Sequence, residues 1–239
     1  MKVAISNLAW NFNRDDEVLL YLKSKNVKGL EIAPAKIFGG PEHIFSKKTE
    51  ITTSTYKNKC KEKYGLEIVA FQAILFGHPE LKIFKSTETR NATKKYLKKM
   101  IELAQKFGAK NLVLGSPKNR DIESLQTQKA YTIAVDFFSE LGEFAQKHQT
   151  NLCIEPNPKE YHCNFINTST EGAQIVHDVG SAGFLLHLDS GAMHMNEENY
   201  EKTIAENIDI VSHFHISNPH LKGFENPAVK HEKLGKILK

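Results

Sequence analysis

The sequence has little that would support a disulfide, a membrane span or a secretory signal. It contains three cysteines, Cys60, Cys153 and Cys163, and no two are spaced as a metal-binding pair, so we expect reduced thiols. No apolar run approaches the roughly 20 residues that cross a bilayer. Met1 and Lys2 lead directly into an apolar segment, without a cleavable signal. These absences predict a cytoplasmic protein with no membrane partner.

An excess of charge of one sign is also lacking. The chain has 32 basic and 28 acidic residues, and the net charge of +4 is distributed along its length. So small an excess does not favour a nucleic-acid partner. The sequence shows no linker, low-complexity tract or charged block that would divide it. We therefore expect residues 1–239 to form a single domain.

Short apolar runs alternate with amphipathic segments along the whole chain. The apolar runs are rich in β-branched and aliphatic residues and span 2–10, 28–33, 66–73, 110–116, 151–156, 184–190 and 211–217. Between them, residues 15–26, 93–108 and 131–149 have apolar side chains at i, i+3, i+4 and i+7, which predicts helices. Strands and helices that alternate in this way form parallel sheets with right-handed helical crossovers.

Two folds fit this alternation, the open doubly wound sheet and the (β/α)8 barrel. A dinucleotide-binding doubly wound sheet carries G-x-G-x-x-G after its first strand, where this chain has NLAWNFNRDD. The barrel therefore fits better. The last segment, 228–239, has the pattern of a helix, and no eighth strand follows it. We predict an α/β fold, a (β/α)8 barrel with the eighth strand missing from the 239 residues, which leaves two unpaired sheet edges.

Three metal-competent side chains end three consecutive predicted strands. Glu155 ends the fifth strand, Asp189 the sixth and His215 the seventh. Because functional groups of such barrels gather at the C-terminal ends of the strands, we expect these three to converge. Two carboxylates and one imidazole suit a divalent ion such as Mn²⁺, Co²⁺, Mg²⁺ or Zn²⁺, without selecting among them. The sequence thus predicts a metal site at the barrel mouth.

Two further histidines lie one step deeper on the same strands. Side chains alternate along a strand, so His187 shares the face of Asp189 and His213 shares the face of His215. Each lies about 6.6 Å below its neighbour, at roughly 3.3 Å per residue. We predict that these histidines form the second shell, in which their hydrogen bonds orient the metal ligands.

Polar side chains at other strand ends are candidates for substrate binding. Gln72 ends the third strand and can hydrogen-bond a hydroxyl group of a substrate. Lys118 and Arg120, in the segment GSPKNR after the fourth strand, can bind an anionic or polyhydroxyl substrate. A buried amide that bonds the backbone, and a solvated loop, are the alternative interpretations of these residues.

Motifs at the strand ends carry a resemblance to a known family. IEPNP, LDSGAM and HFHIS follow one another at the ends of strands five, six and seven, and GLEIAPAKIFG and LVLGSPKNR precede them. With these motifs the chain resembles the xylose isomerase-like TIM barrels. The resemblance implies that Glu155, Asp189 and His215 bind a divalent metal ion. It also implies a fourth glutamate ligand on strand eight that has no counterpart here. His194 and His220 are further candidates for substrate binding, although His194 lies five residues past Asp189, where the family has a histidine three past, and His220 stands in a loop that carries an arginine in the ketose epimerases.

The same resemblance implies a function. The expected activity is that of a metal-dependent sugar or sugar-phosphate isomerase or epimerase, in which Glu155 removes a proton alpha to a carbonyl and an enediolate forms. Because the family's second glutamate is absent, we expect residues 1–239 alone to bind metal weakly and turn over slowly. An apurinic endonuclease-like metal phosphodiesterase and a non-catalytic carbohydrate-binding barrel are the alternatives. The expected partner is a small sugar or sugar phosphate. The sequence leaves open whether the protein forms a homo-oligomer.

Overall fold

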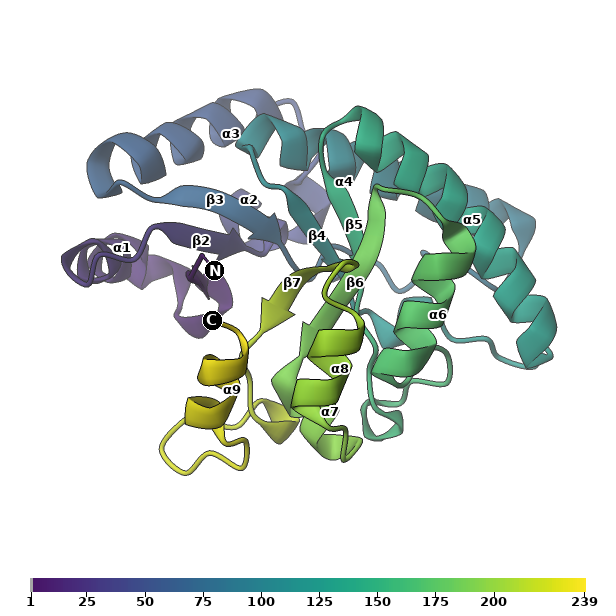
Figure 1. Cartoon of the computed structure of the whole chain (residues 1–239). Coiled ribbons are helices and arrows are strands. Elements are labelled where there is room, and N and C mark those ends of the chain that lie inside the picture. The colour runs from purple at the N-terminus through teal and green to yellow at the C-terminus, as the bar shows by residue number, and fades with distance from the viewer. Residues whose placement is uncertain (1) are drawn as a thin grey trace.

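Seven parallel strands form one curled sheet in the computed structural model, which describes residues 2–239 (Figure 1). Each strand pairs with the next strand of the chain, in the order β1 to β7. The strands are β1 (Ala4–Ser6), β2 (Gly29–Ile32), β3 (Glu67–Phe71), β4 (Asn111–Leu114), β5 (Asn151–Ile154), β6 (Phe184–Asp189) and β7 (Val211–His215). This order confirms the predicted α/β barrel topology. Met1 lies outside the described residues.

The two edges of the sheet are β1 and β7. Within residues 2–239, β1 pairs only with β2 and β7 only with β6, so strand pairing does not close the barrel. The segment after β7 forms a helix, as its pattern predicts. The arrangement is consistent with a barrel that has its eighth strand missing from these residues.

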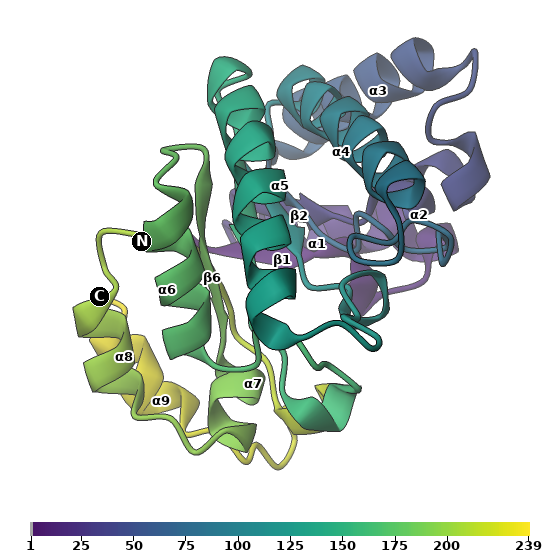
Figure 2. The ribbon, with the colours of Figure 1, turned by 90° about the vertical axis from the view of Figure 1, so that its right-hand side faces the viewer.

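Helices connect the strands and cover the outer face of the sheet, where α4, α5 and α6 lie side by side (Figures 1 and 2). They are α1 (Asp15–Ser24), α2 (Pro34–Phe38), α3 (Thr49–Asn58), α4 (Thr87–Phe107), α5 (Thr127–Lys147), α6 (Ser169–Val179), α7 (Ser190–Met195), α8 (Tyr200–Glu206) and α9 (His231–Ile237). The sequence sets the ends of α4: Ser86 and Thr89 form a capping box, and Gly108 ends the helix in the left-handed region at φ 83°.

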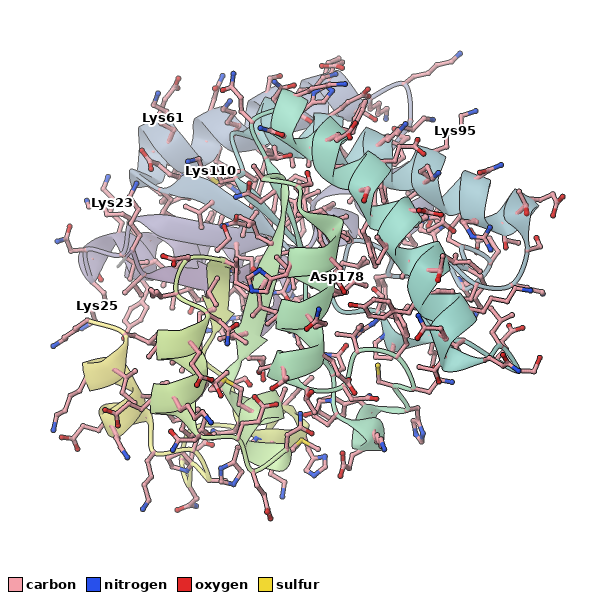
Figure 3. All side chains as sticks on the ribbon, turned by 45° about the vertical axis from the view of Figure 1, so that its right-hand side comes forward. Lys23, Lys25, Lys61, Lys95, Lys110 and Asp178 are labelled. Atoms are coloured by element: carbon pink, nitrogen blue, oxygen red, sulfur yellow. The ribbon has the colours of Figure 1, made fainter. Side chains whose placement is uncertain are left out.

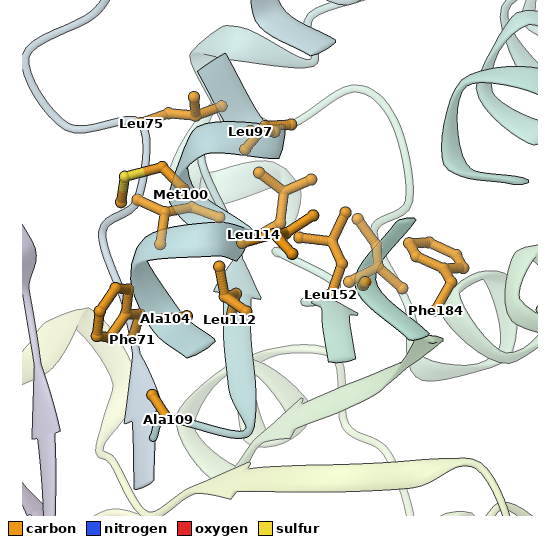
Figure 4. Close-up of a cluster of buried hydrophobic side chains, with 14 of the residues drawn as sticks. Phe71, Leu75, Leu97, Met100, Ala104, Ala109, Leu112, Leu114, Leu152 and Phe184 are labelled. Carbon is orange, nitrogen blue, oxygen red and sulfur yellow. The ribbon is translucent and has the colours of Figure 1, made fainter. Parts of the chain in front are cut away.

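An apolar layer joins the outer face of the sheet to these helices. Leu112, Leu114 and Leu152 are at most 1% exposed and pack beneath helix side chains such as Leu97 and Met100 (Figure 4). Full burial of one such side chain stabilises the fold by about 1.5–3 kcal/mol. This layer fixes the strands, and with them the positions of the side chains that point into the barrel.

The outer surface carries its charge in a distributed way. Figure 3 shows separate exposed lysine side chains, with Lys23 and Lys25 at the end of α1, Lys61 after α3 and Lys95 on α4. Among the described residues, no helix combines the length and the apolar character that crossing a membrane requires.

The first predicted strand is shorter than its apolar run. Residues 2–10 were expected to be extended, but only Ala4–Ser6 pairs as a strand and residues 7–9 form a 3₁₀ turn. The reason is Asn7, which is fully buried and accepts a hydrogen bond from the backbone N–H of Ala33 at 2.9 Å. This side chain replaces the strand pairing that would otherwise continue.

Candidate metal centre and active site

The C-terminal ends of β5, β6 and β7 bring Glu155, Asp189 and His215 together. One potential ligand atom from each lies within 4.8 Å of the others. Glu155 directly follows β5, while Asp189 and His215 are the last residues of β6 and β7. Parallel neighbours end at the same rim, so three separate segments place their side chains at one mouth.

Glu155 occupies space that a glycine provides. A Cβ atom at Gly115, just after β4, would lie 2.2 Å from Glu155 Oε2, so no larger residue fits there without displacing the carboxylate. Asn157 Nδ2 donates to the same Oε2 at 3.3 Å. Burial opposes ionisation, but contacts with His187 and His215 outweigh it and hold the pKa of Glu155 well below its usual value.

Asp189 is held by two hydrogen bonds at one of its oxygens. The backbone N–H of Ala192 and the hydroxyl of Ser217 both donate to Oδ1 at 2.7 Å, so Asp189 also caps α7. Within residues 2–239, no hydrogen bond reaches Oδ2. Burial and the nearby charge of Glu155 raise the pKa of Asp189. A cation between the two carboxylates would relieve this repulsion.

Glu31 on β2 is a member of the site that the sequence analysis missed. It is 3% exposed, and its Oε1 lies 3.0 Å from Nε2 of both His213 and His215. Burial opposes its ionisation, but the two imidazoles outweigh this effect and lower its pKa to about 2. A charged residue inside the otherwise apolar run GLEIA was the available signal, since a buried carboxylate requires partners.

His215 lies between two carboxylates. Its Nε2 faces Glu31, and its Nδ1 lies 3.5 Å from Glu155 Oε1. Burial alone would lower the pKa of His215, yet Glu31 and Glu155 raise it well above its usual value. A carboxylate on one ring nitrogen fixes the ring and directs the other nitrogen to an ion. Nδ1 is therefore the nitrogen of His215 that faces the mouth.

His187 and His213 lie on the predicted face, each beside a carboxylate, and their role as a second shell stays a prediction. His213 contacts Glu31 rather than His215. Nε2 of the fully buried His187 lies 3.3 Å from Glu155 Oε1, without the alignment of a hydrogen bond. Burial, and then the charge of His215, lower the pKa of His187 to about 4.

Arg120 requires a correction. The sequence analysis placed it on a substrate-facing loop, but the side chain is 1% exposed and does not reach the mouth. Its guanidinium donates to five acceptors, the carbonyl oxygens of Gly115, Phe165, Ile166 and Glu155 and Oδ1 of Asn157. Since Asn157 in turn donates to the Glu155 carboxylate, Arg120 fixes both the backbone and the side chain of Glu155. Its role is to position this residue.

The other predicted substrate residues differ in placement. Gln72 lies inside the barrel, where its Nε2 donates to Glu31 Oε2 at 2.5 Å and also to Ser6. Lys118, His194 and His220 are exposed in segments that follow β4, β6 and β7, at the same end as the mouth. Within residues 2–239, no hydrogen bond or ion pair joins these three to Glu155, Asp189 or His215.

The donor set fits a divalent ion. Two carboxylates and one imidazole offer atoms within 4.8 Å of one another. Among the described residues, no lysine or arginine forms an ion pair with Glu155 or Asp189. Oxygen-rich sets of this kind bind Mg²⁺ and Mn²⁺, and the imidazole also admits Co²⁺ and Zn²⁺. Three protein ligands leave coordination positions for water or substrate oxygens.

Comparisons with known proteins agree with this architecture. Residues 22–236 match the family model described as "Xylose isomerase-like TIM barrel". A D-psicose 3-epimerase from Agrobacterium fabrum (strain C58 / ATCC 33970) is 33% identical over 86 residues, which are 36% of this chain and 29% of that protein. The match therefore spans less than a third of the relative's length.

Solved structures share the fold at low identity. D-psicose 3-epimerase from Clostridium cellulolyticum H10 superposes with a TM-score of 0.82 at 16% identity, over 100% of this chain and 80% of the other. The 3-keto-D-glucoside 4-epimerase from E. coli gives a TM-score of 0.76 at 18% identity, over 100% and 87%. Because the family model covers nearly the whole chain, the protein belongs to the xylose isomerase-like TIM-barrel family.

Proposed function

We propose that this chain is a metal-dependent isomerase or epimerase of sugars or sugar phosphates, and that residues 1–239 act as one domain. The observation that carries the proposal is the convergence of Glu155, Asp189 and His215 at the C-terminal ends of three neighbouring strands. The sugar epimerases among the similar proteins support a sugar as substrate.

The proposal gives each residue of the mouth a role. Glu155, Asp189 and His215 would hold Mn²⁺, Co²⁺, Mg²⁺ or Zn²⁺. When bound, such an ion polarises the carbonyl and hydroxyl oxygens of a sugar and stabilises the charge of an enediolate. The Glu155 carboxylate would accept the proton from the carbon alpha to the carbonyl.

Residues behind the mouth keep this geometry. Arg120 and Asn157 fix the Glu155 carboxylate, and Glu31 fixes the ring of His215. The space at Gly115 lets the carboxylate approach β4 closely. Proton transfer depends on such positioning, because a displacement of about 1 Å reduces the rate by about 10²-fold.

The stereochemical outcome depends on how protons are returned. One carboxylate can move a proton between neighbouring carbons on one face of an enediolate, which is an isomerisation. Inversion at a single carbon requires a proton donor on the opposite face. Both outcomes exchange a carbon-bound hydrogen with solvent, so a single assay detects either.

The test combines metal analysis with isotope exchange. The purified chain is dialysed, its metal content is measured, and it is incubated in D₂O with ketoses, aldoses and their phosphates, one at a time, with Mn²⁺ or Mg²⁺ added. We expect the dialysed chain to retain less than one ion per chain, to bind the added Mn²⁺ or Mg²⁺, and to incorporate deuterium slowly at a carbon next to the carbonyl of at least one sugar. Metal binding without exchange would support a non-catalytic sugar-binding barrel, and hydrolysis of abasic DNA would support a phosphodiesterase.

A further inference from the structure

Three histidines form a second cluster beneath the carboxylates of the mouth. Ring nitrogens of His187, His213 and His215 lie within 4.8 Å of one another. The rings of His187 and His215 are 4.1 Å apart between centroids, and His213 is 5.4 Å from each. His187 and His213 are paired residues of the adjacent strands β6 and β7. The sheet itself therefore fixes their spacing.

His187 is the most unusual member of this cluster. It is 0% exposed, and within residues 2–239 neither ring nitrogen makes a hydrogen bond. A buried polar group without a partner destabilises the folded state. Native structures contain few such groups, and each requires an explanation. A leucine would fill this position without that destabilisation. The imidazole differs from leucine in offering a nitrogen lone pair that can bind an ion, and this property explains a histidine at position 187.

The environment leaves one nitrogen on each of the other two rings for an ion. Glu31 Oε1 contacts Nε2 of both His213 and His215, which leaves Nδ1 of each ring as the available donor. His215 Nδ1 and His187 Nε2 both lie beside Glu155 Oε1, at 3.5 Å and 3.3 Å. A carboxylate behind two of the three imidazoles increases their strength as ligands.

We propose that His187, His213 and His215 form a second metal position, which binds a borderline divalent ion of the Zn²⁺ class. Three imidazoles suit Zn²⁺ and Cu²⁺, whereas carboxylate oxygens suit Mg²⁺ and Mn²⁺. We call this set the imidazole position, and Glu155, Asp189 and His215 the carboxylate position. Both positions use His215. An ion at one position therefore excludes an ion at the other.

The inference rests on the proposed function and deepens it, because it makes the mouth selective among metals. Mn²⁺ or Mg²⁺ occupies the carboxylate position and supports turnover. Zn²⁺ occupies the imidazole position, removes His215 from the carboxylate position, and inhibits. The proposed function by itself requires only the carboxylate position.

The test measures Mn²⁺ and Zn²⁺ binding to the metal-free full chain by calorimetry in three variants. Asp189→Asn is expected to weaken Mn²⁺ binding by about tenfold or more and to leave Zn²⁺ binding within about threefold. His187→Leu is expected to weaken Zn²⁺ binding by about tenfold or more and to leave Mn²⁺ binding within about threefold. His177→Leu, at an exposed histidine on α6, is the matched control and changes neither. Zn²⁺ binding that His187→Leu leaves unchanged overturns the imidazole position.

A measurement on the unaltered chain keeps the test decisive if His187→Leu fails to fold. Pulsed electron paramagnetic resonance of one equivalent of Cu²⁺ counts the bound imidazoles. Three bound imidazoles support the proposal, and a single one contradicts it. Failure of the proposed function has a different signature, since Mn²⁺ binding would then be insensitive to Asp189→Asn.

Discussion

Two polar clusters lie inside the same curled sheet. The neutral cluster consists of Asn111, Asn151 and Ser212, from β4, β5 and β7. The ionisable cluster lies closer to the mouth and consists of Glu31, Glu155, His187, His213 and His215. In both, side chains from strands that are not neighbours meet across the interior, which only a curled sheet allows.

The two clusters differ in how completely they are bonded. Asn151 Nδ2 donates to Asn111 Oδ1 at 3.0 Å and to Ser212 Oγ at 3.1 Å, and Ser212 Oγ donates to Asn111 Oδ1 at 2.7 Å. These three side chains satisfy one another's hydrogen bonds, so their contribution to the stability of the fold is enough to explain them. The ionisable cluster keeps a histidine with two unbonded nitrogens and carboxylates without a lysine or arginine partner. Unused bonding capacity of this kind distinguishes a site from a polar core.

The largest expected effect comes from the ionisable cluster. Glu155→Gln keeps the shape of the side chain but removes its charge and its ability to accept a proton. We expect deuterium exchange into sugar to fall by about 10²–10⁴-fold. Glu160→Gln, in the exposed turn after β5, is the control and should retain exchange. Full exchange by Glu155→Gln would mean that another group is the base.

The next largest effect is expected at Arg120, whose hydrogen bonds fix the backbone and the side chain of Glu155. Arg120→Leu removes five hydrogen bonds and leaves buried carbonyl oxygens without donors. We expect the free energy of unfolding, measured in urea, to fall by about 3 kcal/mol or more. Lys118→Leu, two residues earlier and exposed, should change it by less than about 0.5 kcal/mol. Equal urea midpoints for the two variants would contradict this role of the Arg120 hydrogen bonds.

A smaller effect is expected in the neutral cluster. Asn151→Leu leaves Asn111 and Ser212 without a shared partner, so the free energy of unfolding should fall by about 1–3 kcal/mol. Mn²⁺ affinity, measured by calorimetry, should stay within about threefold of the original value. Loss of Mn²⁺ binding in a folded Asn151→Leu protein would show that the two clusters are coupled.

The smallest expected change in stability, that of His187→Leu, distinguishes the two clusters most clearly. His187→Leu replaces a buried imidazole that lacks hydrogen bonds, so stability should change by less than about 1 kcal/mol or increase. The same urea measurement applies. A loss as large as that of Asn151→Leu would show that His187 is a bonded structural residue in solution.

The fold and the three residues of the mouth were accessible to sequence reasoning because both depend on local periodicity. Alternation of apolar runs and amphipathic segments fixes the order of parallel strands. Period-two alternation then places Glu155, Asp189 and His215 on inner faces at equivalent heights. These rules involve only neighbours along the chain or the sheet.

The rest of the site depends on contacts between distant segments. Glu31 contacts His213 across the interior, 182 residues away in the chain, and no periodicity connects the two. Arg120 follows a strand as an exposed loop residue would, and its burial is set by carbonyl oxygens of the segment at 165–166. The deeper histidines were placed on the right face, but the carboxylate beside His213 is Glu31, which no local pattern indicates, and the one beside His187 is Glu155. The curvature of the sheet brings these distant segments together, and local patterns along the chain do not predict those contacts.

The most direct test is anomalous diffraction from crystals of the full chain that contain Mn²⁺. The account predicts one peak at the mouth, about 2.0–2.2 Å from a carboxylate oxygen of Glu155, a carboxylate oxygen of Asp189 and Nδ1 of His215. Absence of a peak there at saturating Mn²⁺, or an ion bound only by other residues, would contradict it.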